Sequence, residues 1–181
     1  MALTTDMRHR RWRSPHVLLA ALFASGCAQP TPIETVPRVD IERFIGRWYV
    51  VASIPTFLER GAHNAVETYQ RDADGSIATT FSFRRDSFDG PLVEYRPRGY
   101  VRDESAAIWG MRFVWPFEAE YRIVYLASDY SLTVIGRTKR DYVWVMARAP
   151  EIPAADYARV VTLVREFGYD ITELEMVPQR W

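Results

Sequence analysis

Few residues in this 181-residue chain could carry out acid–base or nucleophilic chemistry. Two of its three histidines, His9 and His16, lie within the first 16 residues. His63 follows Glu59 by four positions, and the two could form a dyad, but both fall in a predicted loop. A lone histidine in a loop is seldom catalytic, and the chain has no G-x-S-x-G motif, paired-carboxylate signature or phosphate-binding loop. The sequence therefore disfavours an enzyme and leaves the His63–Glu59 pair as the enzymatic alternative.

Composition also argues against metal, cofactor and nucleic-acid chemistry. The single cysteine, Cys27, excludes a disulfide within the chain and any multi-thiolate zinc or iron–sulfur site. No histidine lies where a predicted strand could offer it to a haem. The 23 Lys and Arg balance 23 Asp and Glu, so there is no basic excess that would attract a nucleic acid. We expect no metal site, no cofactor and no nucleic-acid partner.

The beginning of the chain has the pattern of a secretory signal peptide. Four arginines within residues 8–13 precede an apolar stretch over residues 17–23, and small residues follow up to Cys27. The apolar stretch is far shorter than the roughly 20 residues of a membrane-spanning helix. We therefore expect residues 1–26 to be a signal peptide that is removed from the mature protein.

The tetrapeptide Ala24-Ser25-Gly26-Cys27 resembles the bacterial lipoprotein box, in which the cysteine is acylated and becomes the new N-terminus. This resemblance implies lipid attachment at Cys27, and Ala28 in the next position implies sorting to the outer membrane, facing the periplasm. The alternative is an ordinary signal peptide with an incidental or buried cysteine. Residues 27–39 contain three prolines and are predicted to form an extended, lipidated tether. Residues 40–181 would form one domain.

Short β-rich runs separated by turn residues make up most of that domain. Their spacing, without helices between them, favours an all-β, eight-stranded antiparallel up-and-down barrel over βαβ units. Pro97 inside the fourth run predicts a bulge or a break. The runs cover residues 48–54, 65–70, 76–83, 92–101, 107–114, 121–127, 131–136 and 142–148.

One helix is predicted after the barrel strands. It starts at Pro153, carries Val160, Val161, Val164 and Phe167 at helical spacing, and ends before Gly168. Its apolar stripe should pack on the outer wall of the barrel. A final short strand within residues 171–177 should add to the edge of the sheet.

Alternation along each strand assigns one face to the barrel interior. Where one face carries an arginine, as at Arg112 and Arg122, we place that face outside. A barrel of eight strands is either filled by its side chains or holds one small ligand. The residues expected inside are Phe81, Phe83, Trp109, Met111, Phe113, Tyr121, Ile123 and Tyr125.

Three ordered motifs resemble those of lipocalins. The segment Gly46-Arg47-Trp48-Tyr49 looks like the G-x-W-Y signature, and Asp129-Tyr130 resembles the second motif, T-D-Y, with Ser128 in place of threonine. Arg148 matches the arginine of the third motif. The resemblance covers about residues 38–178 and is greatest to bacterial outer-membrane and plant lipocalins.

The motif residues have structural interpretations. Gly46 permits a tight entry into the first strand. Trp48 can plug one end of the barrel, and Arg148 can lie over its ring as a cation–π pair while donating to nearby carbonyls. Asp129 and Tyr130 can tie the turn at that same end. We therefore assign these residues to the fold and not to ligand contact.

The lipocalin resemblance implies a carrier of fatty acids or lysophospholipids, with the ligand near the open end of the barrel. Tyrosine hydroxyls or an arginine near the mouth would suit a carboxylate or phosphate head. The alternative is a structural or partner-binding lipoprotein whose barrel is already full, and the sequence leaves a homodimer open. The candidate lining residues are Trp144, Tyr142, Tyr121, Tyr125, Trp109, Met111 and Phe83.

Overall fold

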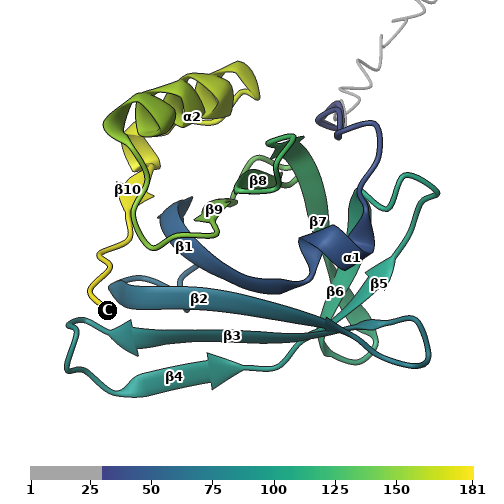
Figure 1. The fold of residues 1–181 in the computed structure, drawn as a ribbon, viewed down its shortest axis with the longest axis horizontal. Coiled ribbons are helices and arrows are strands. Elements are labelled where there is room, and N and C mark those ends of the chain that lie inside the picture. Colours follow the sequence, from purple (N-terminus) through teal and green to yellow (C-terminus); the bar gives the residue numbers. More distant parts are fainter. Residues whose placement is uncertain (1–29) are drawn as a thin grey trace, which may run out of the picture.

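The computed structural model describes residues 30–181, which form a closed antiparallel barrel (Figure 1). Neighbours in the sequence pair along the sheet, and pairing of β1 with β9 closes it, so the predicted barrel is confirmed. The predicted signal peptide and Cys27 lie outside the described residues. The barrel strands are β1 (Gly46–Ile54), β2 (Ala62–Arg71), β3 (Ile77–Arg85), β4 (Leu92–Tyr95), β5 (Arg98–Val101), β6 (Ile108–Val114), β7 (Phe117–Leu126), β8 (Leu132–Gly136) and β9 (Val143–Ala147).

The fourth predicted strand is divided at Pro97. β4 pairs with the second half of β3, at Phe81–Arg84, while β5 pairs with its beginning, at Ile77 and Ala78. Proline has no N–H to donate to a neighbouring strand, which explains a break at this position. The carbonyl of Pro97 still accepts a hydrogen bond from the Thr79 N–H, at 3.1 Å. The barrel therefore keeps eight strand positions although one of them is interrupted.

The two ends of the barrel differ in their connections. Helix α1 (Ile41–Phe44) and the turns 72–76, 102–107 and 127–131 lie at one end, which we call the closed end. The connections 55–61, 86–91, 115–116 and 137–142 lie at the opposite end, which we call the open end. α1 is capped by Asp40, whose side chain accepts hydrogen bonds from the N–H groups of the first turn.

Helix α2 (Ala154–Glu166) lies on the outside of the barrel (Figure 1). Val160 and Val164 are fully buried against outward-facing residues of the strands, and Gly168, with a φ of 87°, follows the end of the helix. Pro153, the predicted first residue, occupies the N-cap position, so the helix starts one residue later than predicted, at Ala154. Within residues 30–181, no helix has the length and apolar character needed to cross a membrane.

The final strand is shorter than predicted. Residues Ile171–Glu173 form a 3-10 helix, η1, because the Asp170 carboxylate accepts a hydrogen bond from the Thr172 N–H at 2.9 Å and begins a turn there. Only β10 (Glu175–Met176) is a strand, and it pairs with Ala52 and Ser53 of β1.

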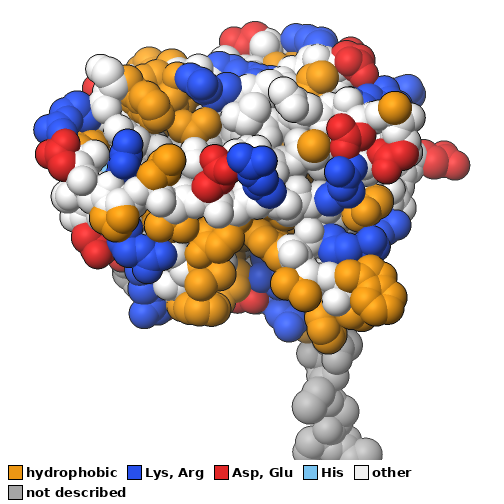
Figure 2. All heavy atoms as spheres, turned by 90° about the horizontal axis from the view of Figure 1, so that it is seen from below, with side chains coloured by type: hydrophobic (Ala, Val, Ile, Leu, Met, Phe, Trp, Pro, Cys, Tyr) orange, Lys and Arg blue, Asp and Glu red, His pale blue; other side chains and the backbone are white. Residues whose placement is uncertain are grey.

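Two apolar cores result from the alternation of the strands. One fills the barrel and includes Trp48, Tyr69 and Trp109, and the other lies between the outer wall and α2. The surface in Figure 2 carries charged side chains of both signs, with hydrophobic side chains gathered toward its lower edge. The fold thus buries apolar residues on both faces of β1, β8 and β9.

The segment before α1 lies along the barrel. It has no regular secondary structure between residues 30 and 40, as its prolines predict, yet Ile33 and Val39 are buried. The Val36 N–H donates to the Ile123 carbonyl at 3.0 Å, and the Arg122 Nε donates to the Ile33 carbonyl at 3.0 Å. From about residue 31 onward, this part of the predicted tether packs on the barrel, because its apolar side chains find buried positions there.

Candidate ligand-binding site

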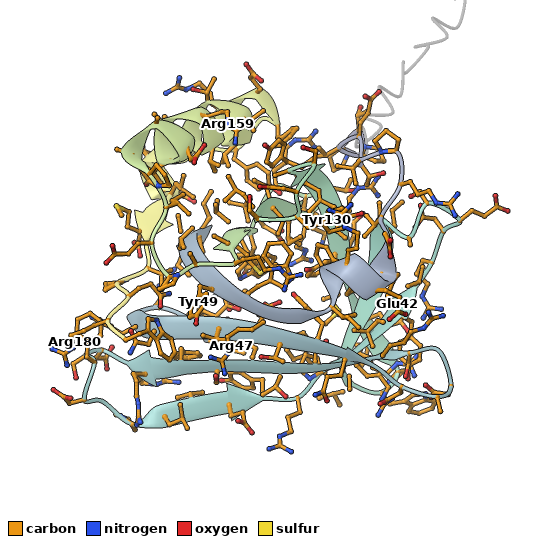
Figure 3. All side chains as sticks on the ribbon, in the orientation of Figure 1. Glu42, Arg47, Tyr49, Tyr130, Arg159 and Arg180 are labelled. Carbon is orange, nitrogen blue, oxygen red and sulfur yellow. The ribbon has the colours of Figure 1, made fainter. Side chains whose placement is uncertain are left out.

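A cavity of about 50 Å³ lies inside the barrel, toward the open end. This volume has room for a few water molecules and is well below the roughly 300–1,000 Å³ of a typical ligand pocket. Side chains fill the rest of the space between the strands (Figure 3). The apolar lining residues are Phe81, Pro97, Met111, Phe113, Ala119 and Trp144, and the polar ones are Glu59, Glu67, Thr79, Glu120 and Tyr121.

Three of the seven candidate lining residues border this cavity, namely Trp144, Met111 and Tyr121. Trp109 is buried among aromatic side chains at the closed end, with its ring centroid 5.5 Å from that of Phe44. The remaining interior candidate, Phe83, is fully buried beside Phe81 and Tyr95 and does not line the cavity. Tyr142 lies in the β8–β9 connection, where the Arg137 guanidinium is 5.3 Å from its ring centroid.

Tyr125 faces the outside of the barrel, so its predicted interior orientation is wrong. The register between β7 and β8 shifts between Ile123 and Tyr125, and such an irregularity exchanges the two faces of a strand. Tyr125 borders an outer groove of about 540 Å³ beneath α2. The Arg159 guanidinium of α2 is 5.5 Å from its ring centroid, and Figure 3 shows Arg159 on that helix. Regular alternation could not have revealed this bulge.

Phe113 faces the interior as predicted, but only at its rim. It borders the cavity, but 55% of its surface is exposed at the open end. Phe113 lies near the end of β6, where the register with β7 shifts between Met111 and Val114, so its side chain faces the cavity at the rim. Phe113 therefore lies where a ligand would enter the barrel.

The carboxyl groups of Glu59 and Glu67 line the cavity, which was not predicted from the sequence. Burial raises the pKa of Glu67 to about 8, with a smaller contribution from the nearby Glu59 charge. Burial also raises the pKa of Glu59, although hydrogen bonds from Thr56 and Trp144 oppose the shift. The alternation Ala65-Glu67-Tyr69 in β2 could have indicated Glu67, since it shares a face with two buried residues, whereas no such signal exists for Glu59 in the β1–β2 connection.

Hydrogen bonds connect these carboxyl groups to aromatic side chains. The Tyr69 hydroxyl donates to Glu67 Oε2 and lies 2.8 Å from the Tyr121 hydroxyl. The Trp144 Nε1 donates to Glu59 Oε2 at 3.1 Å. Burial raises the pKa of Tyr121 well above its usual value, so its hydroxyl stays protonated at neutral pH. The cavity therefore combines apolar walls with a polar patch of two carboxyl groups and a tyrosine hydroxyl.

The lipocalin-like motif residues gather at the closed end. Trp48 is fully buried and donates from Nε1 to the Phe44 carbonyl at 2.8 Å. The Arg148 guanidinium lies 3.8 Å from the centroid of a Trp48 ring. It also donates to the carbonyls of Arg43, Phe44 and Ile45, at 2.7–3.0 Å. Arg148 thereby satisfies the carbonyl groups at the end of α1, which have no partners within the helix.

The turn beside Arg148 is held by the second motif. The Asp129 carboxylate accepts hydrogen bonds from the N–H and hydroxyl of Ser131, at 3.0 and 2.7 Å. The Tyr130 hydroxyl accepts a hydrogen bond from the Asp40 N–H at 2.9 Å, and Figure 3 shows Tyr130 beside α1. Tyr49 points outward and packs edge-on against the ring of Trp181, with centroids 5.3 Å apart.

The proposed dyad of His63 and Glu59 is not formed. His63 Nδ1 lies 3.0 Å from the Gly61 carbonyl, and its ring packs against Phe88. Glu59 instead accepts hydrogen bonds from the Thr56 N–H and from Trp144. In residues 30–181, no group of three or more His, Cys, Asp or Glu side chains is arranged to hold a metal ion.

Comparison with known proteins agrees with this architecture. The chain is 28% identical to temperature-induced lipocalin-1 of Arabidopsis thaliana, over 81% of this chain and 83% of the plant protein. It is 26% identical to the outer membrane lipoprotein Blc of Escherichia coli K12, over 88% of this chain and 92% of that protein. The crystal structure of the cockroach allergen Per a 4 superimposes with a TM-score of 0.62 at 18% identity, covering 84% of this chain and 96% of the allergen.

The match to a whole domain family is decisive for classification. The lipocalin-like domain matches residues 39–179, which include α1, all the barrel strands, α2 and β10. This range begins at the buried Val39. The chain belongs to the lipocalin-like family.

Proposed function

We propose that this protein is a lipid-anchored carrier that binds a fatty acid or a lysophospholipid in its barrel, at the bacterial outer membrane. The observation that carries the proposal is the cavity between Met111, Tyr121 and Trp144, inside a barrel of the lipocalin-like family. A small hydrophobic ligand is the general expectation for such a site. The acyl chain is the more specific part of the proposal.

The chemistry of the cavity favours entry of the acyl chain before the head group. Phe81, Met111 and Phe113 offer apolar contacts to a hydrocarbon chain. A carboxylate or phosphate placed deep in the barrel would face Glu59, whose charge already raises the pKa of Glu67, and like charges repel. With a pKa of about 8, Glu67 is mostly uncharged at pH 7. The head group would therefore remain near the open end, while the chain passes the neutral carboxyl group.

Binding an acyl chain requires the cavity to expand. A volume of about 50 Å³ is too small for one, so side chains at the open end must move. Phe113 is partly exposed at the rim, and Trp144 is held by its hydrogen bond to Glu59. Displacement of Trp144 would change its fluorescence, which provides a direct signal for binding.

Two observations support the membrane part of the proposal. The segment Ala24–Cys27 has the pattern of a lipoprotein box. Relatives from Escherichia coli and Citrobacter freundii, both 26% identical to this chain, are named as outer membrane lipoproteins. An acyl anchor at Cys27 would hold the carrier beside the lipids that we propose it binds.

The test is a ligand titration of residues 28–181, delipidated and followed by tryptophan fluorescence. We expect saturable quenching by a long-chain fatty acid or a lysophospholipid at micromolar or lower concentration. Ala119→Phe, which places a ring in the cavity, should weaken binding at least about tenfold because it occupies the space of the ligand. Ala73→Phe, in an exposed closed-end turn, is the matched control and should bind as the original protein does.

The filled barrel remains the competing function. If neither ligand changes the fluorescence of a protein that circular dichroism shows to be folded, the side chains keep the barrel full. Equal binding by the Ala119→Phe and Ala73→Phe proteins would place the ligand outside the cavity. Either result would contradict lipid carriage in the barrel.

A further inference from the structure

The exposed large hydrophobic side chains are concentrated at the open end. The β6–β7 hairpin presents Phe113, Val114, Trp115 and Phe117, which are 55%, 69%, 77% and 76% exposed. An apolar group of this kind on a soluble surface marks a site of contact with a protein, a ligand or a membrane.

Neighbouring connections extend this apolar rim. Phe57 and Leu58 are exposed in the β1–β2 connection, and Leu92 is exposed where β4 begins. All three lie at the open end, whereas none of the exposed large hydrophobic residues in the described part of the chain lies in a closed-end turn. Seven of the nine exposed large hydrophobic residues in the described part thus lie at the open end, and the other two, Met176 and Trp181, belong to the C-terminal segment.

The tip of the hairpin contains no charged residue, and the charged side chains beside it contact one another. Residues 113–117 read Phe-Val-Trp-Pro-Phe. Arg112 Nη2 lies 2.5 Å from Glu118 Oε1, and Arg102 contacts the same carboxylate. A hairpin with aromatic side chains at an uncharged tip, and ion pairs farther from the tip, suits the interfacial region of a bilayer, where tryptophan is favoured.

The described chain begins at this same end. The Arg140 side chain, in the β8–β9 connection at the open end, donates from Nη1 to the Thr31 carbonyl at 2.9 Å. The chain then passes β7 and reaches Ser105 at the closed end, where the Val39 N–H donates to its carbonyl at 2.8 Å (Figure 1). Cys27 precedes Pro30 by three residues, which span at most about 10 Å when extended. An acyl anchor at Cys27 would therefore be joined to the open end by a short span of chain.

We propose that the open end of the barrel docks on a phospholipid bilayer through the β6–β7 hairpin, with the mouth of the cavity facing the membrane. Phe113 belongs both to this hairpin and to the cavity lining, so docking would bring the lipid surface to the entrance of the site. The orientation rests on the anchor at Cys27 in the proposed function, whereas the hairpin contact rests on its own exposed residues. A bilayer is favoured over a protein partner because the anchor and the apolar rim share one end.

The experiment uses the processed protein, with the state of Cys27 first established by mass spectrometry. Val114→Cys and Ala73→Cys are each labelled with an environment-sensitive dye, at the hairpin and at the closed end respectively. Both positions are exposed, so neither change removes buried packing. The proteins are placed on vesicles of phosphatidylglycerol and dibrominated phosphatidylcholine in equal amounts, and quenching by the bromines is measured.

We expect quenching at position 114 to exceed quenching at position 73 at least about fivefold, because interfacial side chains enter the bilayer by roughly 5–10 Å. Equal quenching, or stronger quenching at 73, on acylated protein would overturn the docking while leaving ligand carriage intact. If Cys27 carries no acyl chain, the anchor fails, and quenching at 114 by added vesicles still decides the hairpin contact. If the dye at position 114 is shielded from water without vesicles and becomes exposed on dilution, the hairpin contacts a second copy of the chain. That result would overturn the proposal.

Discussion

The closed and open ends of this barrel are built from the same strands. They differ in how many of their polar groups are hydrogen-bonded and how many of their aromatic side chains are buried. At the closed end, Arg148 lies over Trp48 and bonds the carbonyls that end α1. On the open side of Trp48, Glu67 lines the cavity and is buried with a raised pKa, and at the open end itself Trp115 is 77% exposed. The contacts at the closed end stabilise the fold. The buried carboxyl group and the exposed aromatic side chain on the open side lower the stability of the isolated protein. Shifted pKa values and exposed apolar side chains are expected where a protein binds a ligand or a partner.

The largest effect of breaking the closed end should come from Trp48→Ala. Removing this fully buried ring leaves a cavity and should lower the free energy of unfolding by about 3–5 kcal/mol. Urea denaturation followed by circular dichroism measures the change. Trp181→Ala is the control and should cost less than about 1 kcal/mol because Trp181 is exposed. Similar losses in both variants would contradict the structural role of Trp48.

Burial of Glu67 should make the free energy of unfolding depend on pH. Folding raises the pKa of Glu67 from 4.5 to about 8, so the folded state holds a proton that the unfolded state releases. Stability is greatest below about pH 4.5 for this group and falls as the pH rises to about 8. We expect a loss on the order of 2–3 kcal/mol, because each pKa unit corresponds to about 1.4 kcal/mol and the effective dielectric constant of a protein is higher than that of a dry interior.

Glu67→Gln isolates this contribution from those of other carboxyl groups. The variant should be more stable than the original protein near pH 9 and should lose most of the decline between about pH 5 and pH 9, because glutamine does not ionise. Denaturant titrations at several pH values provide the comparison. Burial raises the pKa of Glu59 as well, so a smaller decline of the same sign should persist. If stability declines as much in Glu67→Gln as in the original protein, the decline comes from other ionisable groups.

Arg148→Met should cost about 2 kcal/mol, since buried carbonyls of α1 lose their donor while the aliphatic bulk is kept. Thermal denaturation of the variant checks this value. Arg159→Met removes a cation over Tyr125 on the outer wall and should cost less than about 1 kcal/mol. If the two variants are equally stable, the carbonyl contacts of Arg148 contribute little.

The smallest effect is expected at Gly46. Its φ of 98° is unfavourable for other residues, so Gly46→Ala should cost about 1 kcal/mol. Its new Cβ would lie 3.4 Å from Arg148 Nη1, an ordinary contact. Gly75→Ala, with a φ of 82° and open space around it, should give nearly the same loss. A much larger loss at Gly46 would show that Arg148 cannot adjust.

The sequence predicted the closed end well because its signals are local. Trp48 follows Gly46 at the start of a strand, and Arg148 ends another, so residue type and position were enough to suggest their roles. The order of the strands, the break at Pro97 and the helix over the outer wall also followed from alternation, turn residues and helical spacing.

Tertiary structure decided which residues meet at the open end. The register shift beside Ile123 turned Tyr125 outward, and the types of these residues do not predict a bulge. The proximity of Glu59 to Trp144 depends on a loop and a strand 85 positions apart. Local patterns determine which elements form, because they reflect backbone preference and burial. Register and loop packing determine the site, because they depend on contacts between distant segments.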